Sequence, residues 1–149
     1  MKYSDFRPRL KGNKKIAYDN LNSNERRILV IGDIHAPFEL DGYLDFCKET
    51  YAKYLCNQVI YIGDIIDNHY TSYHETSADG AGGLDELKYA IKAVKKWRKA
   101  FPKADVLIGN HDRMVMRKAQ TSDIPSAWIK SYNEVLGTNW NWVERIVYD

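Results

Sequence analysis

Three short runs of apolar residues, rich in β-branched side chains and each followed by glycine, constrain the fold of this chain more than any other feature. They cover residues 28–31, 59–62 and 106–108. Because their apolar character is continuous rather than alternating, we expect strands buried on both faces, as in a parallel or mixed sheet covered by helices. The glycine after each run allows the backbone to turn sharply where the strand ends.

Apolar residues at helical spacing predict helices between and after these strands. One is expected to begin at Pro37, one to end before Pro102, and one to cover about residues 126–136 with Gly137 as its C-cap. The predicted order is therefore β-α-β-α-β-α, an α/β fold. Right-handed crossovers then place the carboxyl ends of all three strands at one edge of one sheet, where open α/β folds bind their ligands.

The composition predicts one globular domain. The chain has 149 residues, of which 44% are hydrophobic and 13% aromatic, and this excludes a disordered or low-complexity protein. No apolar run approaches the ~20 residues needed to cross a bilayer, and the first residues lack the apolar core of a signal peptide. We therefore expect a cytoplasmic protein with no membrane partner. Cys47 and Cys56 lack metal-type spacing and are expected to be buried as small hydrophobes.

The formal net charge of +2 hides an uneven distribution of charge. Residues 1–27 hold eight basic and three acidic side chains, residues 83–103 hold seven and two, and the remainder holds seven and fifteen. A solvated helix face explains the second basic stretch at least as well as nucleic-acid binding does. Residues 1–24 show no sustained period, so we expect an N-terminal arm followed by a domain over residues 25–149.

Side chains suited to metal binding follow the three glycines. The blocks are Gly32-Asp33-Ile34-His35, Gly63-Asp64-Ile65-Ile66-Asp67 and Gly109-Asn110-His111-Asp112. Carboxylates gathered at one sheet edge need compensation, because like charges at close range cannot all stay ionised, and divalent cations supply it. Carboxylate, imidazole and amide ligands suit manganese, iron or zinc. Any one block alone is typical of an ordinary turn or helix cap, whereas three blocks at three strand ends favour a metal site.

These blocks resemble the calcineurin-like metallophosphoesterase superfamily, whose pattern runs D-x-H, G-D-x-x-D, G-N-H-[DE], a lone His and G-H-x-H. The first three blocks match in order, over about residues 27–118. The resemblance implies an αββα sandwich, of which this chain would hold only the N-terminal half. None of the four histidines follows His111, so the later blocks have no counterpart, and the domain is expected to be incomplete at its C-terminus.

The resemblance also implies which residues would hold metal. Asp33 and His35 would bind the first of two divalent ions, manganese, iron or zinc. Asp64 would bridge both ions, and Asn110 would bind the second. These assignments leave the second ion with only two protein ligands, because the later histidines of the family pattern are absent.

Further residues near these ligands receive roles in the same way. By resemblance, His111 would stabilise charge at the scissile phosphate and protonate the leaving oxygen, and Asp67 would orient His111 through a hydrogen bond. His69 and His74 lie in the long polar loop that follows, and we interpret them as substrate-loop residues, with replacement ligands or an exposed structural role as alternatives. Asp112 is expected to be the N-cap of the next short helix.

The sequence thus predicts a metal-dependent phosphoesterase, which hydrolyses phosphomonoesters or phosphodiesters by attack of metal-bound hydroxide at a two-metal site. One alternative is an inactive phosphoesterase-like module that binds nucleic acid or protein, and another is a fragment that completes its site with a second chain. Residues 139–149 are typical of a strand just beginning to pair, whose tryptophans would lack cover, as would one face of the sheet. We therefore expect self-association.

Overall fold

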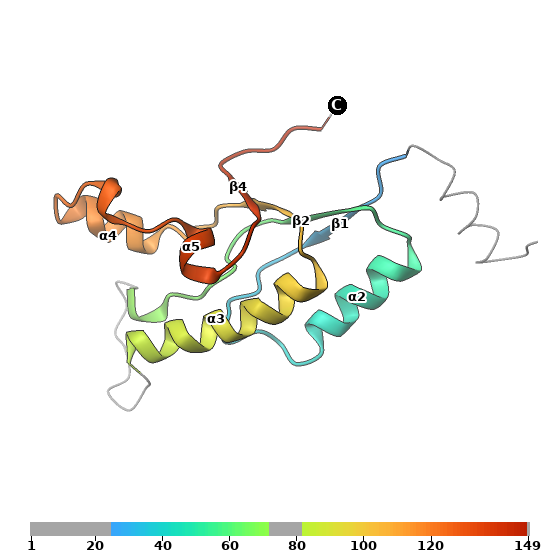
Figure 1. The fold of residues 1–149 in the computed structure, drawn as a ribbon, viewed down its shortest axis with the longest axis horizontal. Helices are drawn as coiled ribbons and strands as arrows, with labels where there is room; N and C mark the ends of the chain where they lie inside the picture. Colours follow the sequence, from blue (N-terminus) through green and yellow to red (C-terminus); the bar gives the residue numbers. More distant parts are fainter. Residues whose placement is uncertain (1–24, 72–81, 149) are drawn as a thin grey trace, which may run out of the picture.

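The computed structural model describes residues 25–71 and 82–148 and contains a four-stranded sheet in the order β1-β2-β3-β4 (Figure 1). The strands are β1 (Ile28–Ile31), β2 (Gln58–Tyr61), β3 (Asp105–Leu107) and β4 (Asn141–Val143). All neighbouring pairs are parallel. The three predicted strands are confirmed to within one residue. The terminal segment forms a fourth strand that pairs fully with β3, so it is not merely beginning to pair.

Helices connect these strands in the predicted order. They are α2 (Tyr43–Lys53), α3 (Gly83–Ala100), α4 (Met114–Thr121) and α5 (Tyr132–Leu136), with short 3-10 helices η2 (His69–Thr71) and η3 (Ser126–Trp128). The chain is therefore an α/β protein, as expected. Its predicted N-terminal arm, residues 1–24, lies outside the described residues.

Two helix boundaries differ from the prediction. The first helix does not begin at Pro37, because the residues that follow form a turn in which the Phe38 N–H donates to the His35 carbonyl, and α2 starts after Gly42 at φ 80°. The stretch 126–136 is not one helix, because Ile129 is extended and Ser131 starts a separate helix with a capping box. Gly137 is confirmed as the C-cap, at φ 65°.

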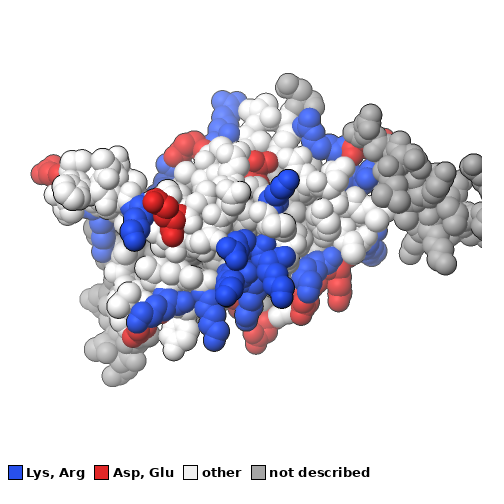
Figure 2. All heavy atoms as spheres, in the orientation of Figure 1, with Lys and Arg blue, Asp and Glu red and all other residues white. Residues whose placement is uncertain are grey.

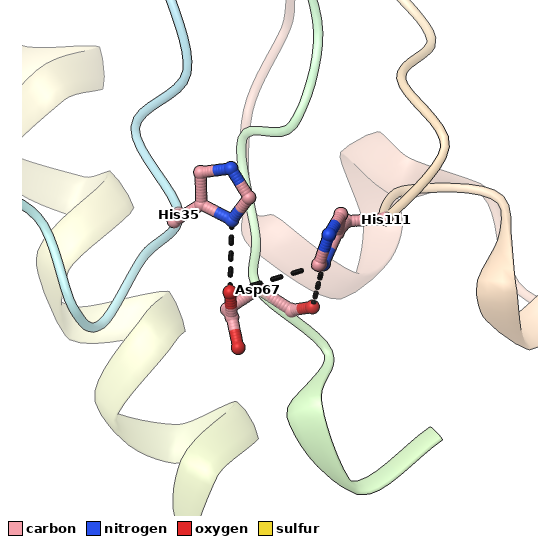
Figure 3. Close-up of side chains that lie close together, drawn as sticks. All are labelled: His35, Asp67 and His111. Atoms are coloured by element: carbon pink, nitrogen blue, oxygen red, sulfur yellow. Dashed lines mark hydrogen bonds and ion pairs between the residues drawn. The ribbon is translucent and has the colours of Figure 1, made fainter. Parts of the chain in front are cut away.

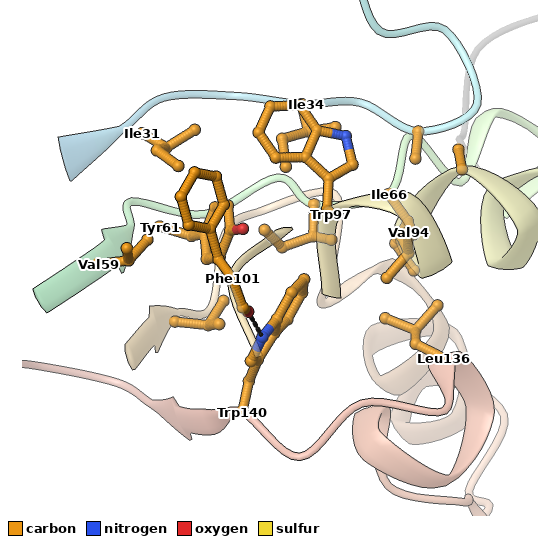
Figure 4. Close-up of a cluster of buried hydrophobic side chains, with 14 of the residues drawn as sticks. Ile31, Ile34, Val59, Tyr61, Ile66, Val94, Trp97, Phe101, Leu136 and Trp140 are labelled. Atoms are coloured by element: carbon orange, nitrogen blue, oxygen red, sulfur yellow. Dashed lines mark hydrogen bonds between the residues drawn. The ribbon is translucent and has the colours of Figure 1, made fainter. Parts of the chain in front are cut away.

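The hydrophobic core lies between the sheet and the helices α2 and α3, which cover one of its faces (Figures 1 and 4). Alternate strand residues such as Ile31 and Tyr61 point toward Trp97 of α3, which is 1% exposed. Trp140 is 2% exposed, packs against Tyr61, and its indole N–H donates to the Phe101 carbonyl. The expectation that the terminal tryptophans would lack cover is therefore wrong for Trp140.

The opposite face of the sheet is less well covered by the described residues. Val30 and Ile62, which point away from the helices, are 55% and 49% exposed. One end of this face is crossed by residues 144–148, where the Tyr148 hydroxyl hydrogen-bonds with the side chains of Gln58 and Asp105. The described residues form one sheet, so the second sheet of the expected sandwich is not among them.

Cys47 is buried and Cys56 is half-buried against the core, and both are free thiols. Within the described ranges, no helix combines the length and the apolar character that a membrane span requires.

Candidate metal centre

The three strand-end blocks meet at one edge of the sheet, as the parallel topology requires. Asp33, His35 and Asp64 each offer one ligand atom, and these atoms all lie within 4.8 Å of one another. Asp64 is 9% exposed and its Oδ1 accepts a hydrogen bond from the His111 N–H at 2.9 Å. Asp64 is thus in contact with the turn after β3 as well as with the turn after β1.

A second group consists of His35, Asp67 and His111 (Figure 3). His35 Nδ1 lies 2.8 Å from Asp67 Oδ1, whereas His111 Nδ1 lies 2.6 Å from the Asp67 carbonyl oxygen and 3.8 Å from Oδ1. The two imidazole rings meet edge to face, with centroids 4.6 Å apart. Asp67 therefore contacts His111 as predicted, but mainly through its main chain, and its carboxylate is closer to His35.

The contact of His111 with a carbonyl oxygen fixes which nitrogen of this ring carries the proton. A carbonyl oxygen only accepts, so His111 must donate from Nδ1, which leaves Nε2 to exchange a proton. His35 Nδ1 lies 2.8 Å from Asp67 Oδ1 and its Nε2 lies 3.8 Å from Asp64 Oδ2, so a proton on Nδ1 would be donated to Asp67 and would leave Nε2 as a metal ligand. Such a carboxylate partner is typical of metal-binding histidines, because it orients the ring and raises its basicity.

The backbone of the turns is strained where the ligands lie. His35 and Asp64 both have φ 51°, in the left-handed region that residues other than glycine seldom adopt. The Asp64 carbonyl accepts from the N–H groups of Ile34 and His35, which couples the two turns. A Cβ at Gly109 would overlap the backbone nitrogen and Oδ1 of Asp64, so the third block needs glycine for this close approach.

Asp112 is a buried acceptor and not the N-cap that the sequence predicts. Its Oδ1 accepts from the N–H groups of Ile65 and Ile66 at 3.0 and 3.3 Å, and its Oδ2 accepts from the Gly109 N–H at 2.9 Å. The N-cap of α4 is Arg113. Asp112 is 1% exposed, and this burial raises the pKa of its carboxyl group, although the N–H groups partly oppose the shift.

A family model for the calcineurin-like phosphoesterases matches residues 26–147. The chain belongs to the calcineurin-like phosphoesterase family. No curated protein and no solved structure gives a significant match. Membership supports the predicted fold and a metal-dependent phosphoester hydrolase as the function at family level.

The donor set of this calcineurin-like phosphoesterase fits a divalent cation. Asp33, His35 and Asp64 supply carboxylate oxygens and an imidazole nitrogen, which suit manganese, iron or zinc, and Nδ1 of His35 contacts Asp67, so Nε2 is the nitrogen that would bind the ion. Asn110, the predicted ligand of a second ion, is exposed in the turn after β3. Asn110 and Asp64 are the two predicted ligands of the second ion.

Of the two predicted substrate-loop histidines, His69 lies among the described residues, and it is not brought into these groups. His69 lies in η2, is exposed, and belongs to neither candidate group found in the described part of the chain. His74 lies outside the described residues. Their roles in substrate binding remain predictions.

Sequence reasoning missed one residue that supports the site, because the Asn68 side chain donates to the His111 carbonyl at 2.9 Å. It also missed the buried Glu86 carboxylate, which accepts from the N–H groups of His69 and Tyr70 and so holds η2, outside the two candidate groups. Asn68 also has φ 51°. An asparagine directly after the second block was the available signal, because asparagine adopts the left-handed region more easily than most residues.

Proposed function

We propose that this calcineurin-like phosphoesterase hydrolyses phosphomonoesters or phosphodiesters at a two-metal site that includes Asp33, His35, Asp64 and Asn110. The observation that carries the proposal is the meeting of three ligand atoms from two strand-end turns within 4.8 Å, in a chain of this family. When bound, divalent ions supply Lewis-acid activation of water and of the phosphoryl oxygens. Among manganese, iron and zinc, we choose manganese as the first ion to test.

Asp64 is the proposed bridge between the two ions. It lies between the turn of His35, whose Nε2 is 3.8 Å from Asp64 Oδ2, and the turn of His111, whose N–H bonds to Oδ1. Its position supports a shared ligand, because a carboxylate offers two oxygens in different directions. Asp33 and Asn110 would each serve one ion.

His111 is the proposed general acid. Its Nδ1 donates to the Asp67 carbonyl, so Nε2 is the atom that would give a proton to the leaving oxygen and take one from water afterwards. The side chain is 28% exposed, so a substrate can reach it. Asp67 orients both histidines, His111 through its carbonyl oxygen and His35 through its carboxylate.

The test is a parallel assay of an aryl phosphate monoester and a diaryl diester. We expect hydrolysis that requires Mn²⁺, is abolished by a chelator and returns when the ion is restored. The variant Asp64→Asn is the matched control, since the amide keeps the shape of the side chain. Equal hydrolysis by both proteins, or hydrolysis without metal, would contradict the proposal.

Nucleic-acid binding is the second candidate function, and the surface of α3 favours it. Basic side chains gather over this helix in Figure 2. The exposed lysines of α3 recur along the helix at Lys88, Lys92, Lys95, Lys96 and Lys99. A row of like charges along one helix suits a phosphate backbone, either of a nucleic-acid substrate or of a bound partner.

Salt dependence distinguishes this candidate from simple solvation of the helix. We expect a fluorescent oligonucleotide to bind metal-free protein, and the double variant Lys95→Gln/Lys99→Gln to lower the salt slope by ~0.7 for each lost phosphate contact on a single strand. The control is Lys48→Gln/Lys53→Gln on α2. Binding that both double variants weaken equally would argue against a specific surface on α3.

Self-association is proposed for the sheet face that carries Val30 and Ile62. These side chains are 55% and 49% exposed, and a second copy of the chain would remove them from water. We expect light scattering to detect a dimer or larger species, and Val30→Lys to shift it toward monomer. Phe46→Lys, at an exposed position of α2, is the control. A wild-type monomer at high concentration would contradict this proposal.

A further inference from the structure

Asp112 is a buried carboxylate to which the proposed chemistry gives no role. The residue is 1% exposed, and its carboxylate contacts two of the turns that carry the candidate metal centre. Oδ1 accepts from Ile65 and Ile66, the residues between Asp64 and Asp67. Oδ2 accepts from Gly109, directly before Asn110. Each oxygen therefore holds the backbone of one turn.

The bonds to Asp112 act where the backbone most needs support. Asp64 has φ 51°, and a conformation of this kind persists only where the surrounding structure over-determines it. The N–H groups of the next two residues are both bound to Oδ1 of Asp112. On the other side, Gly109 approaches Asp64 more closely than any residue with a Cβ could. Asp112 thus fixes the backbone on both sides of this contact.

Asp112 is itself held in place from a third element. The Tyr132 hydroxyl of α5 donates to the Asp112 carbonyl at 2.9 Å, and the Tyr132 ring stacks on Trp142 with centroids 4.3 Å apart. The backbone of Asp112 is therefore anchored to the core through α5 and β4. An anchored group that bonds two turns can set the distance between them.

We infer that Asp112 is a positioning residue, whose carboxylate sets the spacing between the turn of Asp64 and the turn of Asn110 and thereby the affinity for divalent cations. The inference rests on the proposed function, because it concerns the same site. Only a carboxylate accepts with both oxygens. An asparagine would offer one acceptor and one NH₂ group, and the NH₂ group would face an N–H donor, so one of the two turns would be released.

The experiment compares Asp112→Asn with Glu86→Gln by calorimetric titration with Mn²⁺, at a temperature where circular dichroism shows both variants to be folded. Glu86 is a matched control, because it is also a buried carboxylate whose two oxygens accept backbone N–H groups, but from η2. We expect Asp112→Asn to weaken Mn²⁺ binding by about 10–100-fold, the range typical of residues that support metal ligands, and Glu86→Gln to leave it nearly unchanged.

The conservative variant Asp112→Glu keeps both acceptors and is expected to give an affinity between those of the wild type and Asp112→Asn. If Asp112→Asn does not fold, the Mn²⁺ affinity of Asp112→Glu is compared with that of Glu86→Asp instead. A folded Asp112 variant that binds Mn²⁺ as tightly as the wild type and shows only a lower melting temperature would overturn this inference. The proposed function would not be affected. Failure of the wild type to bind Mn²⁺ would overturn the proposed function and this inference together.

Discussion

The covered face of the sheet and the edge that carries the candidate metal centre obtain their order in opposite ways. On the covered face, apolar side chains such as Ile31, Val94 and Trp97 are at most 1% exposed and are held by packing. At the edge, His35 and Asp64 have unusual backbone angles and are held by hydrogen bonds. The packed residues of the covered face are expected to control the stability of the fold. The hydrogen-bonded residues of the edge are expected to control metal binding.

The comparison shows how the two regions depend on each other. A left-handed conformation at a residue other than glycine costs about 1–3 kcal/mol, so His35 and Asp64 lower the stability of the fold. The core must supply that free energy through burial. If this division is correct, mutations at the edge change metal binding with little effect on stability, and mutations in the core do the reverse.

The largest expected effect is that of Asp64→Asn on metal binding. The amide keeps the size of the side chain and tolerates φ 51°, but it lacks the charge that both ions would share. We expect Mn²⁺ affinity to fall by more than the ~100-fold upper end for residues that only support ligands. Asp33→Asn should weaken mainly one ion. Calorimetric titration of both variants tests this, and unchanged affinity in Asp64→Asn would exclude a shared carboxylate.

His111→Ala is expected to lower turnover by about 10²–10⁴-fold while the protein keeps its metal, because the proposed acid is lost and the proposed ligands remain. The loss should be smaller for a nitrophenyl ester, whose leaving group needs no proton, than for an alkyl ester. Metal analysis and kcat for both esters provide the measurement. Equal losses on the two esters would contradict the acid role.

Trp97→Ala tests whether the core controls the stability of the fold. Trp97 is 1% exposed and meets the rings of Tyr43 and Tyr61 edge to face. Its removal is expected to lower the free energy of unfolding by about 3–5 kcal/mol. Urea denaturation measures this loss, with the exposed Phe46→Ala as control. Mn²⁺ affinity of the folded fraction should stay as in the wild type, and a parallel loss would show that core and edge are not separable.

Local sequence patterns predicted the core better than its connections. The apolar runs and their glycines were sufficient to place β1, β2 and β3, because a buried parallel strand leaves a continuous signal. The break between η3 and α5 was missed, since both pieces carry apolar residues at helical spacing. The Ser131-x-x-Glu134 capping box is the sequence signal that marks this break.

Long-range contacts explain what could not be predicted at the edge. The blocks identified the residues that meet there, since parallel strands bring their carboxyl ends together. The partners of Asp112 Oδ1 are 46 and 47 residues away in the turn after β2, and Asp67 meets His35 from 32 residues away. The spacing of apolar residues along the chain does not predict hydrogen bonds over such separations. Asp112, a polar residue next to a helix, is therefore interpreted from sequence as a cap, although its carboxylate bonds its own turn and the turn after β2.

Tyr43→Phe is the smallest expected effect, at the point where core and edge meet. The Tyr43 ring packs against Trp97, while its hydroxyl donates to the Gly32 carbonyl at 3.1 Å, directly before Asp33. Loss of this bond is expected to cost ~1 kcal/mol of stability. Because Gly32 adjoins a proposed ligand, Mn²⁺ binding should also weaken, by less than the ~10-fold lower end for residues that support ligands. Denaturation and titration are compared with Tyr51→Phe, a half-buried tyrosine of the same helix that packs against Phe101. An effect on stability without any effect on binding would place Tyr43 wholly in the core, and the division between the two regions would then be sharper than the structure indicates.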